Sequence, residues 1–162
     1  MRKLKFLVDA MLGHIARWLR VLGIDAMDYR QCGLDDEALL KCAKRSGRIV
    51  LTRDSDLYAR ARKLGVRAIL LSTDDIVGAL AELSKELGIP LEIDLSKTRC
   101  PMCNTPLKRK RSSEVRGIPD GVKRRFQFVY VCEGCGKVYW TGSHYDRMKE
   151  TLERVRKRAR QL

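Results

Sequence analysis

The sequence contains no long hydrophobic run, no internal repeat and no low-complexity tract. No apolar stretch approaches the roughly 20 residues that a helix needs to span a bilayer, which excludes a transmembrane helix. The opening M-R-K-L-K-F-L-V resembles the start of a signal sequence, but Asp9, His14, Arg17 and Arg20 interrupt the apolar run. No basic helix carries the large aromatic face of a membrane-surface helix. We therefore expect a soluble, cytoplasmic protein with no membrane partner.

Acidic residues are scarce in the second half of the chain, although the net charge of the whole sequence is +14. Residues 1–98 carry 17 Lys and Arg against 14 Asp and Glu, whereas residues 99–162 carry 17 against 6. A strongly basic segment beside a nearly balanced one indicates a polyanionic partner, and nucleic acid fits better than acidic lipid. A highly charged, solvated surface of a heat-adapted protein is the alternative.

Four of the six cysteines form two C-x-x-C motifs, C-P-M-C at 100–103 and C-E-G-C at 132–135, with 28 residues between them. Thiolates spaced in this way can reach one tetrahedral ion from two tight turns. Two disulfides or a redox motif are the alternatives. Cys32 and Cys42 have no partner in this pattern, and no signal peptide indicates an oxidising compartment. We predict structural Zn²⁺ at Cys100, Cys103, Cys132 and Cys135.

Strand patterns alternate with helical patterns in the first 96 residues. Alternation of this kind predicts an α/β fold with a parallel sheet covered by helices on both faces. We place one domain at 1–96 and a second unit, containing the cysteines, at 97–162. The expected strands are 4–8, 48–52 and 66–71, and the expected helices begin near residues 11, 36, 55 and 74.

Aspartates follow the strands of this expected sheet. Asp9 follows the first strand, Asp54 and Asp56 follow the second, and Asp36 begins the helix between them. Carboxyl ends of parallel strands meet at one edge, where ligands bind. Clustered carboxylates repel each other unless a cation joins them, and Mg²⁺ prefers such oxygens. Metal-assisted phosphodiester hydrolysis uses this arrangement. The alternative is that each aspartate caps a helix.

The segment between the two cysteine pairs is expected to be a basic loop. From 108 to 125 it holds eight Lys and Arg against two acids. Such a loop would make sequence-independent contacts to phosphates, unless it is a solvated, disordered segment with no partner. The candidate contacts are Lys108, Arg109, Lys110, Arg111, Lys123, Arg124 and Arg125.

Aromatic residues and a terminal helix complete the second unit. Phe126, Phe128 and Tyr130 alternate, so they line one face of a strand and either stack on bases or pack inside the module. Residues 143–146 resemble a capping box. His144, beside it, is a candidate substrate contact or makes a structural hydrogen bond. An apolar stripe that should dock on the rest of the protein follows at Tyr145, Met148, Leu152, Val155 and Ala159.

Several longer motifs together resemble the PIN-like RNase family named for the C-terminal domain of the Mut-seven exonuclease. The resemblance extends over nearly the whole chain. The motifs are F-L-V-D-A-M-L-G-H-I-A-R-W-L-R-V-L-G (6–23), D-D-E-A-L-L-K-C-A (35–43), R-I-V-L-T-R-D-S-D-L (48–57), C-P-M-C-N-T-P-L (100–107) and C-G-K-V-Y-W-T-G-S-H-Y-D-R-M (135–148).

The resemblance implies a PIN-like α/β domain, a C-terminal zinc ribbon and metal-dependent ribonuclease activity. The leading hypothesis is an endoribonuclease that uses Mg²⁺ or Mn²⁺. The corresponding acids are Asp9, Asp36, Asp54 and Asp56, and Glu37 is an alternative to Asp36. RNA would then be the partner of the basic ribbon. PIN-like domains often form dimers, so the resemblance also indicates a homodimer as one oligomeric state. The competing interpretation is an RNA-binding scaffold without catalysis.

Overall fold

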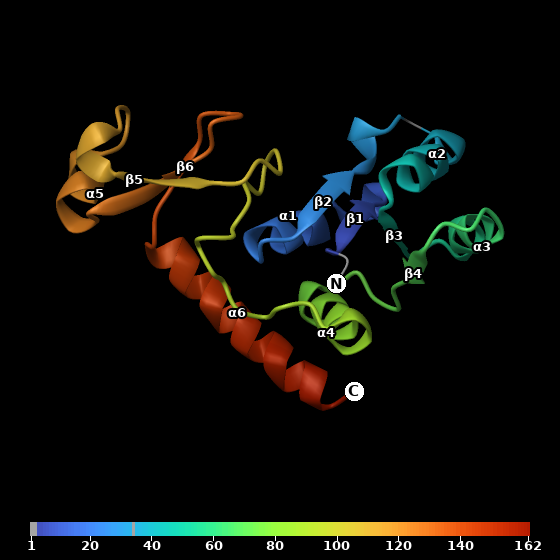
Figure 1. The fold of residues 1–162 in the computed structure, drawn as a ribbon. Coiled ribbons are helices and arrows are strands. Elements are labelled where there is room, and N and C mark those ends of the chain that lie inside the picture. The colour runs from blue at the N-terminus through green and yellow to red at the C-terminus, as the bar shows by residue number, and fades with distance from the viewer. Residues whose placement is uncertain (1–2, 34) are drawn as a thin grey trace.

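The N-terminal half forms a four-stranded parallel sheet in a computed structural model that describes residues 3–33 and 35–162. The strand order is β2-β1-β3-β4 (Figure 1). In the register, Phe6 pairs with Ala26 on one side and with Ile49 on the other. The strands are β1 (Lys5–Val8), β2 (Asp25–Asp28), β3 (Ile49–Thr52) and β4 (Ala68–Leu70).

Helices cover both faces of this sheet. Phe6 and Leu51 lie in a core cluster with residues of α1, α4 and α6, whereas Leu7 and Val50 lie in a second cluster with residues of α2 and α3. Successive side chains of a strand point to opposite faces, so an unbroken apolar run such as I-V-L is buried on both sides. The helices are α1 (Gly13–Val21), α2 (Asp36–Ser46), α3 (Ser55–Lys63), α4 (Ile76–Leu87) and α6 (Ser143–Arg160).

The expected α/β fold is confirmed, and the three expected strands and four expected helices of the N-terminal half are present. The sequence analysis missed β2. Its four residues, D-A-M-D, include two aspartates, and only Ala26 among them is fully buried. Because β2 is an edge strand, it has only one neighbour in the sheet and needs little apolar surface. Residues 1 and 2 of the signal-like start lie outside the described part of the chain.

The cysteine-containing unit holds a three-stranded antiparallel sheet in the order β5-β6-β7. The expected basic loop is wrong at 108–111, where K-R-K-R forms strand β5 with all four residues exposed, and at 120–125, where the chain forms a short helix. Strand β6 supplies its backbone partners, from Lys108 opposite Val131 to Arg111 opposite Phe128. The elements are β5 (Lys108–Arg111), α5 (Asp120–Arg125), β6 (Phe128–Val131) and β7 (Val138–Tyr139).

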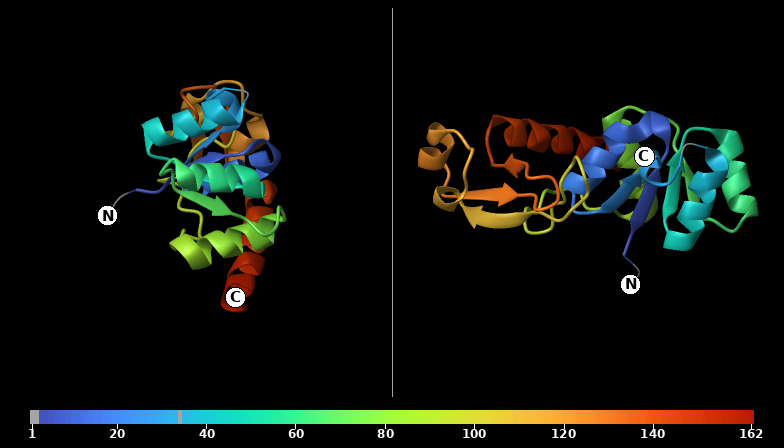
Figure 2. Two further views of the ribbon diagram at one scale, coloured as in Figure 1. Left: turned by 90° about the vertical axis from the view of Figure 1, so that its right-hand side faces the viewer. Right: turned by 90° about the horizontal axis from the view of Figure 1, so that it is seen from above.

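Helix α6 runs from this unit back to the N-terminal sheet (Figures 1 and 2). Leu152 and Val155 are buried in the same core cluster as β1 and α4, and Ala159 packs against it. The second half of the stripe therefore docks as expected, whereas Tyr145 and Met148 lie outside that cluster. The expected capping box is wrong, because Gly142 is the N-cap and no side chain caps the helix. No helix within the described residues is long and apolar enough to cross a bilayer.

The two remaining cysteines are joined. Cys32 and Cys42 form a disulfide, contrary to the expectation that they have no partner. Their Cα atoms lie 5.7 Å apart: Cys32 follows the short helical turn at Tyr29–Gln31, and Cys42 lies within α2. The sequence does not indicate this pairing, because the two cysteines are ten residues apart and lie outside the C-x-x-C motifs.

Candidate functional site

The four cysteines of the C-x-x-C motifs converge in space. Their sulfur atoms all lie within 4.8 Å of one another. Each motif forms a turn: Asn104 N donates to Cys100 O at 2.8 Å, and Gly136 N donates to Cys132 O at 2.8 Å. Each turn ends in a left-handed residue, Asn104 at φ 71° and Gly136 at φ 79°. Asparagine and glycine are the residues that adopt this conformation most readily.

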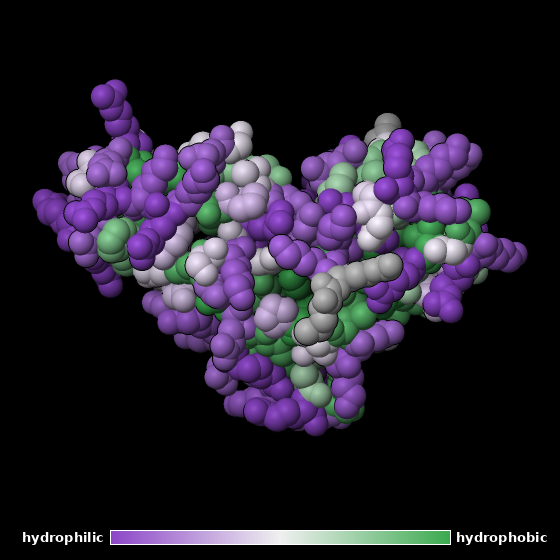
Figure 3. All heavy atoms as spheres, in the orientation of Figure 1, coloured by the Kyte–Doolittle hydropathy of each residue, from purple (hydrophilic) through white to green (hydrophobic). Residues whose placement is uncertain are grey.

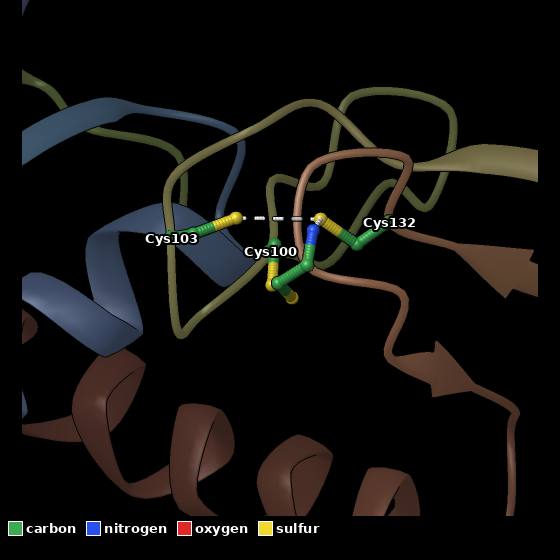
Figure 4. A group of neighbouring side chains, drawn as sticks. Cys100, Cys103 and Cys132 are labelled. Atoms are coloured by element: carbon green, nitrogen blue, oxygen red, sulfur yellow. Dashed lines mark hydrogen bonds between the residues drawn. The ribbon is translucent and has the colours of Figure 1, made fainter.

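The distances between the sulfur atoms fit a shared metal ion. Cys103 Sγ lies 3.3 Å from Cys132 Sγ, and Cys100 Sγ lies 3.7 Å from Cys135 Sγ. Figure 4 shows Cys103 and Cys132 pointing toward each other from the two turns. Four thiolates around tetrahedral Zn²⁺, with bonds of about 2.3 Å, would be about 3.8 Å apart. All four cysteines are free. The cluster can therefore hold a metal such as zinc.

The protein environment shifts the pKa values of two of these thiols in opposite directions. Burial raises the pKa of Cys132 to about 12, whereas a hydrogen bond with Thr105 lowers the pKa of Cys103 to about 6. Burial also raises the pKa of Tyr139, whose hydroxyl lies 3.3 Å from Cys100 Sγ. A bound cation offsets the cost of burying thiolates, because its positive charge favours their deprotonated form.

The first cysteine turn is fastened to the edge strand β2. Asn104 Nδ2 donates to Asp25 Oδ1 at 2.7 Å, and Asn104 Oδ1 accepts from Ala26 N at 3.2 Å. The buried Arg20 donates from Nε to Ala26 O and from Nη1 to Pro101 O. These bonds fix the position of the cysteine cluster relative to the parallel sheet.

Two of the predicted catalytic aspartates are linked at the carboxyl edge of the sheet. Thr52, the last residue of β3, is fully buried. Its hydroxyl donates to Asp9 Oδ2 at 2.8 Å and accepts from Asp54 N at 3.0 Å. Asp9 follows β1, so this threonine connects the ends of two adjacent strands. We call the group of Asp9, Thr52 and Asp54 the acidic edge.

Several of the aspartates also make local hydrogen bonds. Asp9 Oδ1 accepts from Ala10 N at 2.7 Å. Asp54 Oδ1 accepts from Asp56 N and Leu57 N and caps α3. These bonds are the ones expected of helix caps, which was the alternative interpretation.

The other predicted acids lie on helix surfaces. Asp36, in the first turn of α2, pairs with Arg60 at 3.4 Å, and Asp56 is exposed in the first turn of α3. Glu37 is exposed and pairs with Lys41 at 3.1 Å. Within the described residues, only the cysteines form a group of three or more potential ligands within 4.8 Å of one another. A metal site at the four aspartates therefore stays a prediction.

Sequence reasoning missed two side chains at this edge. Thr52 was not considered because a threonine at the end of a strand carries no signal of its own. Asp28 was missed together with β2, which it ends. It caps the following turn and pairs with Arg30 at 3.2 Å. Burial opposes the ionisation of Asp28, but hydrogen bonds from Arg30 outweigh this effect and lower its pKa.

The basic residues lie on two elements of the cysteine-containing unit. Lys108 and Lys110 both pair with Glu133, at 3.3 and 3.7 Å, and the guanidinium of Arg109 lies 4.5 Å from the centre of the Phe128 ring. In the face shown in Figure 3, hydrophilic side chains cover most of this end of the molecule. The remaining basic residues of the set are Arg111 in β5 and Lys123, Arg124 and Arg125 in the last turn of α5.

A family model described as the Mut7-C RNAse domain matches residues 4–152. The matched segment includes the sheet, both cysteine turns and the first half of α6. No curated protein and no solved structure matches the chain.

Proposed function

The chain belongs to the Mut7-C RNAse domain family, and on that premise we propose that it is a metal-dependent endoribonuclease. The active site would be the acidic edge together with Asp36 and Asp56, with Glu37 as the alternative to Asp36. The family description gives the substrate class, and the aspartates at the strand ends supply the candidate chemistry.

The observation that carries the proposal is the position of Thr52. Its buried hydroxyl donates to one oxygen of Asp9 and accepts from the backbone of Asp54, so both acids are held at one edge. A hydrogen bond that orients a carboxylate is the usual support for a metal ligand. Mg²⁺ or Mn²⁺ bound here would activate water and stabilise charge on the reacting phosphate oxygens. Asp54 and Asp56 are exposed, so a phosphate can approach them.

We also propose that the cysteine cluster holds structural Zn²⁺ and that the basic residues of β5 and α5 contact RNA phosphates. Four sulfur ligands leave no open position on a tetrahedral ion, which is typical of structural zinc. Lys108, Arg109, Lys110 and Arg111 are all exposed on a strand whose position depends on the cluster. A cytoplasmic location and a homodimer stay predictions.

The second candidate function is RNA binding without catalysis. The ion pair between Asp36 and Arg60 and the capping bonds of Asp54 favour it, because they give these acids structural roles. In that case the acidic edge would stabilise helix starts, and the basic residues of β5 and α5 would bind the RNA.

Cleavage of RNA by Asp9→Asn separates the two functions. We expect wild-type protein to cleave single-stranded RNA with Mn²⁺ or Mg²⁺, and Asp9→Asn to lose at least about 100-fold in rate, because an amide is a poor ligand for a hard cation. The control is Glu86→Gln, an exposed acid on α4. Equal cleavage by Asp9→Asn and wild type would remove the acidic edge as the active site. Binding without cleavage by wild type would support the scaffold.

A further inference from the structure

A cavity of about 500 Å³ lies where α1, the segment before the first cysteine turn, β7 and the start of α6 meet. Both tryptophans and both histidines of the chain line it: Trp18, Trp140, His14 and His144. Tyrosine rings, Met102 and aliphatic side chains such as Leu95 and Leu107 also line it. We call this space the aromatic cavity.

The aromatic cavity presents ring surfaces that the core does not cover. Trp18 packs on the main core cluster with one part of its ring system, yet it is only half-buried. Trp140 and Tyr145 are half-buried as well, and Met102 is 52% exposed. A pocket of this size, with aromatic walls and a few polar groups, is typical of a site that takes a planar organic ligand.

Two cationic side chains belong to the lining of the aromatic cavity. Arg17 and Lys137 line the aromatic cavity, and both are exposed. A second hollow of about 240 Å³ shares Arg17, His14 and Met102 with it and adds Arg30 and Asp28. The two hollows are therefore neighbours with shared walls, and Arg30 in the second one pairs with Asp28 at 3.2 Å.

The second hollow leads to the carboxyl edge of the sheet. Asp28 ends β2, where it pairs with Val8 of β1. Asp9, a member of the acidic edge, is the next residue after Val8. A ligand extending from the aromatic cavity along Arg17 and Arg30 thus approaches the strand ends at which we place catalysis.

We propose that the aromatic cavity binds an unpaired nucleobase of a single RNA strand, with the adjoining phosphates along Arg17 toward the acidic edge. This inference rests on the proposed function, because it takes RNA as the substrate. Every base has a flat face that can stack on an aromatic ring, so the site selects unpaired RNA rather than one sequence. Paired bases in an RNA helix are stacked on each other and do not enter such a pocket.

Tryptophan fluorescence reports directly on this site, because both tryptophans line it. We expect a single-stranded oligoadenylate of about eight nucleotides to quench the emission, since a base stacked on an indole changes its surroundings. An RNA duplex of equal length and an inorganic polyphosphate of equal charge should quench little. Equal quenching by the polyphosphate or by the duplex would overturn the inference.

Variants test the same site. Trp140→Ala should weaken oligoadenylate binding about 5- to 100-fold, and Trp140→Phe should retain most of the affinity. Met102→Glu places a negative charge at an exposed position in the lining, so it weakens binding without disturbing the core. Leu64→Glu, an exposed residue at the end of α3, is the matched control for charge. Equal loss in both glutamate variants would overturn the inference.

A further control tests an aromatic ring outside the cavity, that of Phe126, which follows α5. Phe126→Ala removes a ring outside the cavity lining and should leave quenching intact. Binding is measured without Mg²⁺ or Mn²⁺, so catalysis does not enter. Quenching by RNA in a protein that cleaves none supports the cavity and rejects the proposed function, whereas cleavage without quenching overturns the cavity alone.

Discussion

The polar residues between the first cysteine turn and β2 form one connected group. Asp25 accepts from Arg48 at 2.7 Å and from Asn104 at 2.7 Å. The side chain of Arg48 is 10% exposed and that of Asp25 is 20% exposed, so water screens the pair weakly. Breaking a buried pair is costly because the remaining charge has no partner.

The pH dependence of folding should reveal this group. Burial opposes ionisation of Asp25, but hydrogen bonds from Arg48 and Asn104 outweigh it and hold its pKa below the ordinary value. The stabilisation is therefore present above the unfolded pKa of about 3.9 and is lost as pH falls through the lower folded pKa.

We expect Asp25→Asn to lower the free energy of unfolding by about 2–4 kcal/mol at pH 7, and by clearly less at pH 3. Urea unfolding at both pH values measures this difference, with Glu86→Gln as the control. A loss of the same size at pH 3 would show that Asp25 contributes through packing and not through its charge.

At the scale of elements, two short segments have structures that their composition hides. K-R-K-R is a strand because β6 lies beside it, although nothing in the four residues favours a sheet. The Cys32–Cys42 disulfide ties the seventh residue of α2 to the segment before the helix, and the side chain of Asp35 caps the helix start. Strand β5 and the attachment of α2 both depend on contacts with other segments and not on the intrinsic propensity of their own residues.

Reduction of this disulfide should therefore destabilise α2 more than it destabilises the parallel sheet. A disulfide that closes a loop of ten residues restricts the unfolded chain and stabilises the fold by about 2–3 kcal/mol. We expect dithiothreitol to lower the stability of wild type by this amount and to leave Cys42→Ser unchanged. Hydrogen exchange should become faster in α2 while β1 and β3 remain protected. An effect of dithiothreitol on Cys42→Ser would point to the four-cysteine cluster instead.

At the scale of the whole molecule, α6 belongs to both halves. Its first turn lines the aromatic cavity beside the cysteine-containing unit, and its Leu152 and Val155 lie in the core of the parallel sheet. Arg156 donates to Leu91 O at 2.6 Å and fastens the helix further. The predicted division at residue 96 stays a prediction, but the halves are linked through this helix.

Loss of the metal should consequently unfold the cysteine-containing unit and leave the parallel sheet with the second half of α6 folded. We expect Cys100→Ser to release Zn²⁺ and to expose β5, β6 and β7 to rapid hydrogen exchange, because the cluster joins the two turns that hold them. The second half of α6 should stay protected, since α4 covers it. Metal analysis and hydrogen exchange on wild type and Cys100→Ser measure both effects. Rapid exchange throughout the parallel sheet would show that the halves do not fold separately.

Features whose signals are local can be predicted from the amino-acid sequence. The C-x-x-C spacing specifies a tight turn that aims two sulfur atoms together, and the apolar periods of the strands and helices specify the α/β fold. Asp9 and Asp54 were found because each follows a strand. These patterns depend on neighbours within a few residues, so no tertiary contact is needed to recognise them.

Which distant segments meet depends on the tertiary fold. It paired β2 with β1, joined Cys32 to Cys42, placed Thr52 between two aspartates and brought Trp18 within reach of Trp140 around one cavity. Contacts of this kind depend on how the chain returns on itself, and short-range patterns carry no record of that path. A strand of D-A-M-D or K-R-K-R exists because a neighbouring strand offers backbone partners, and that neighbour is supplied by the fold.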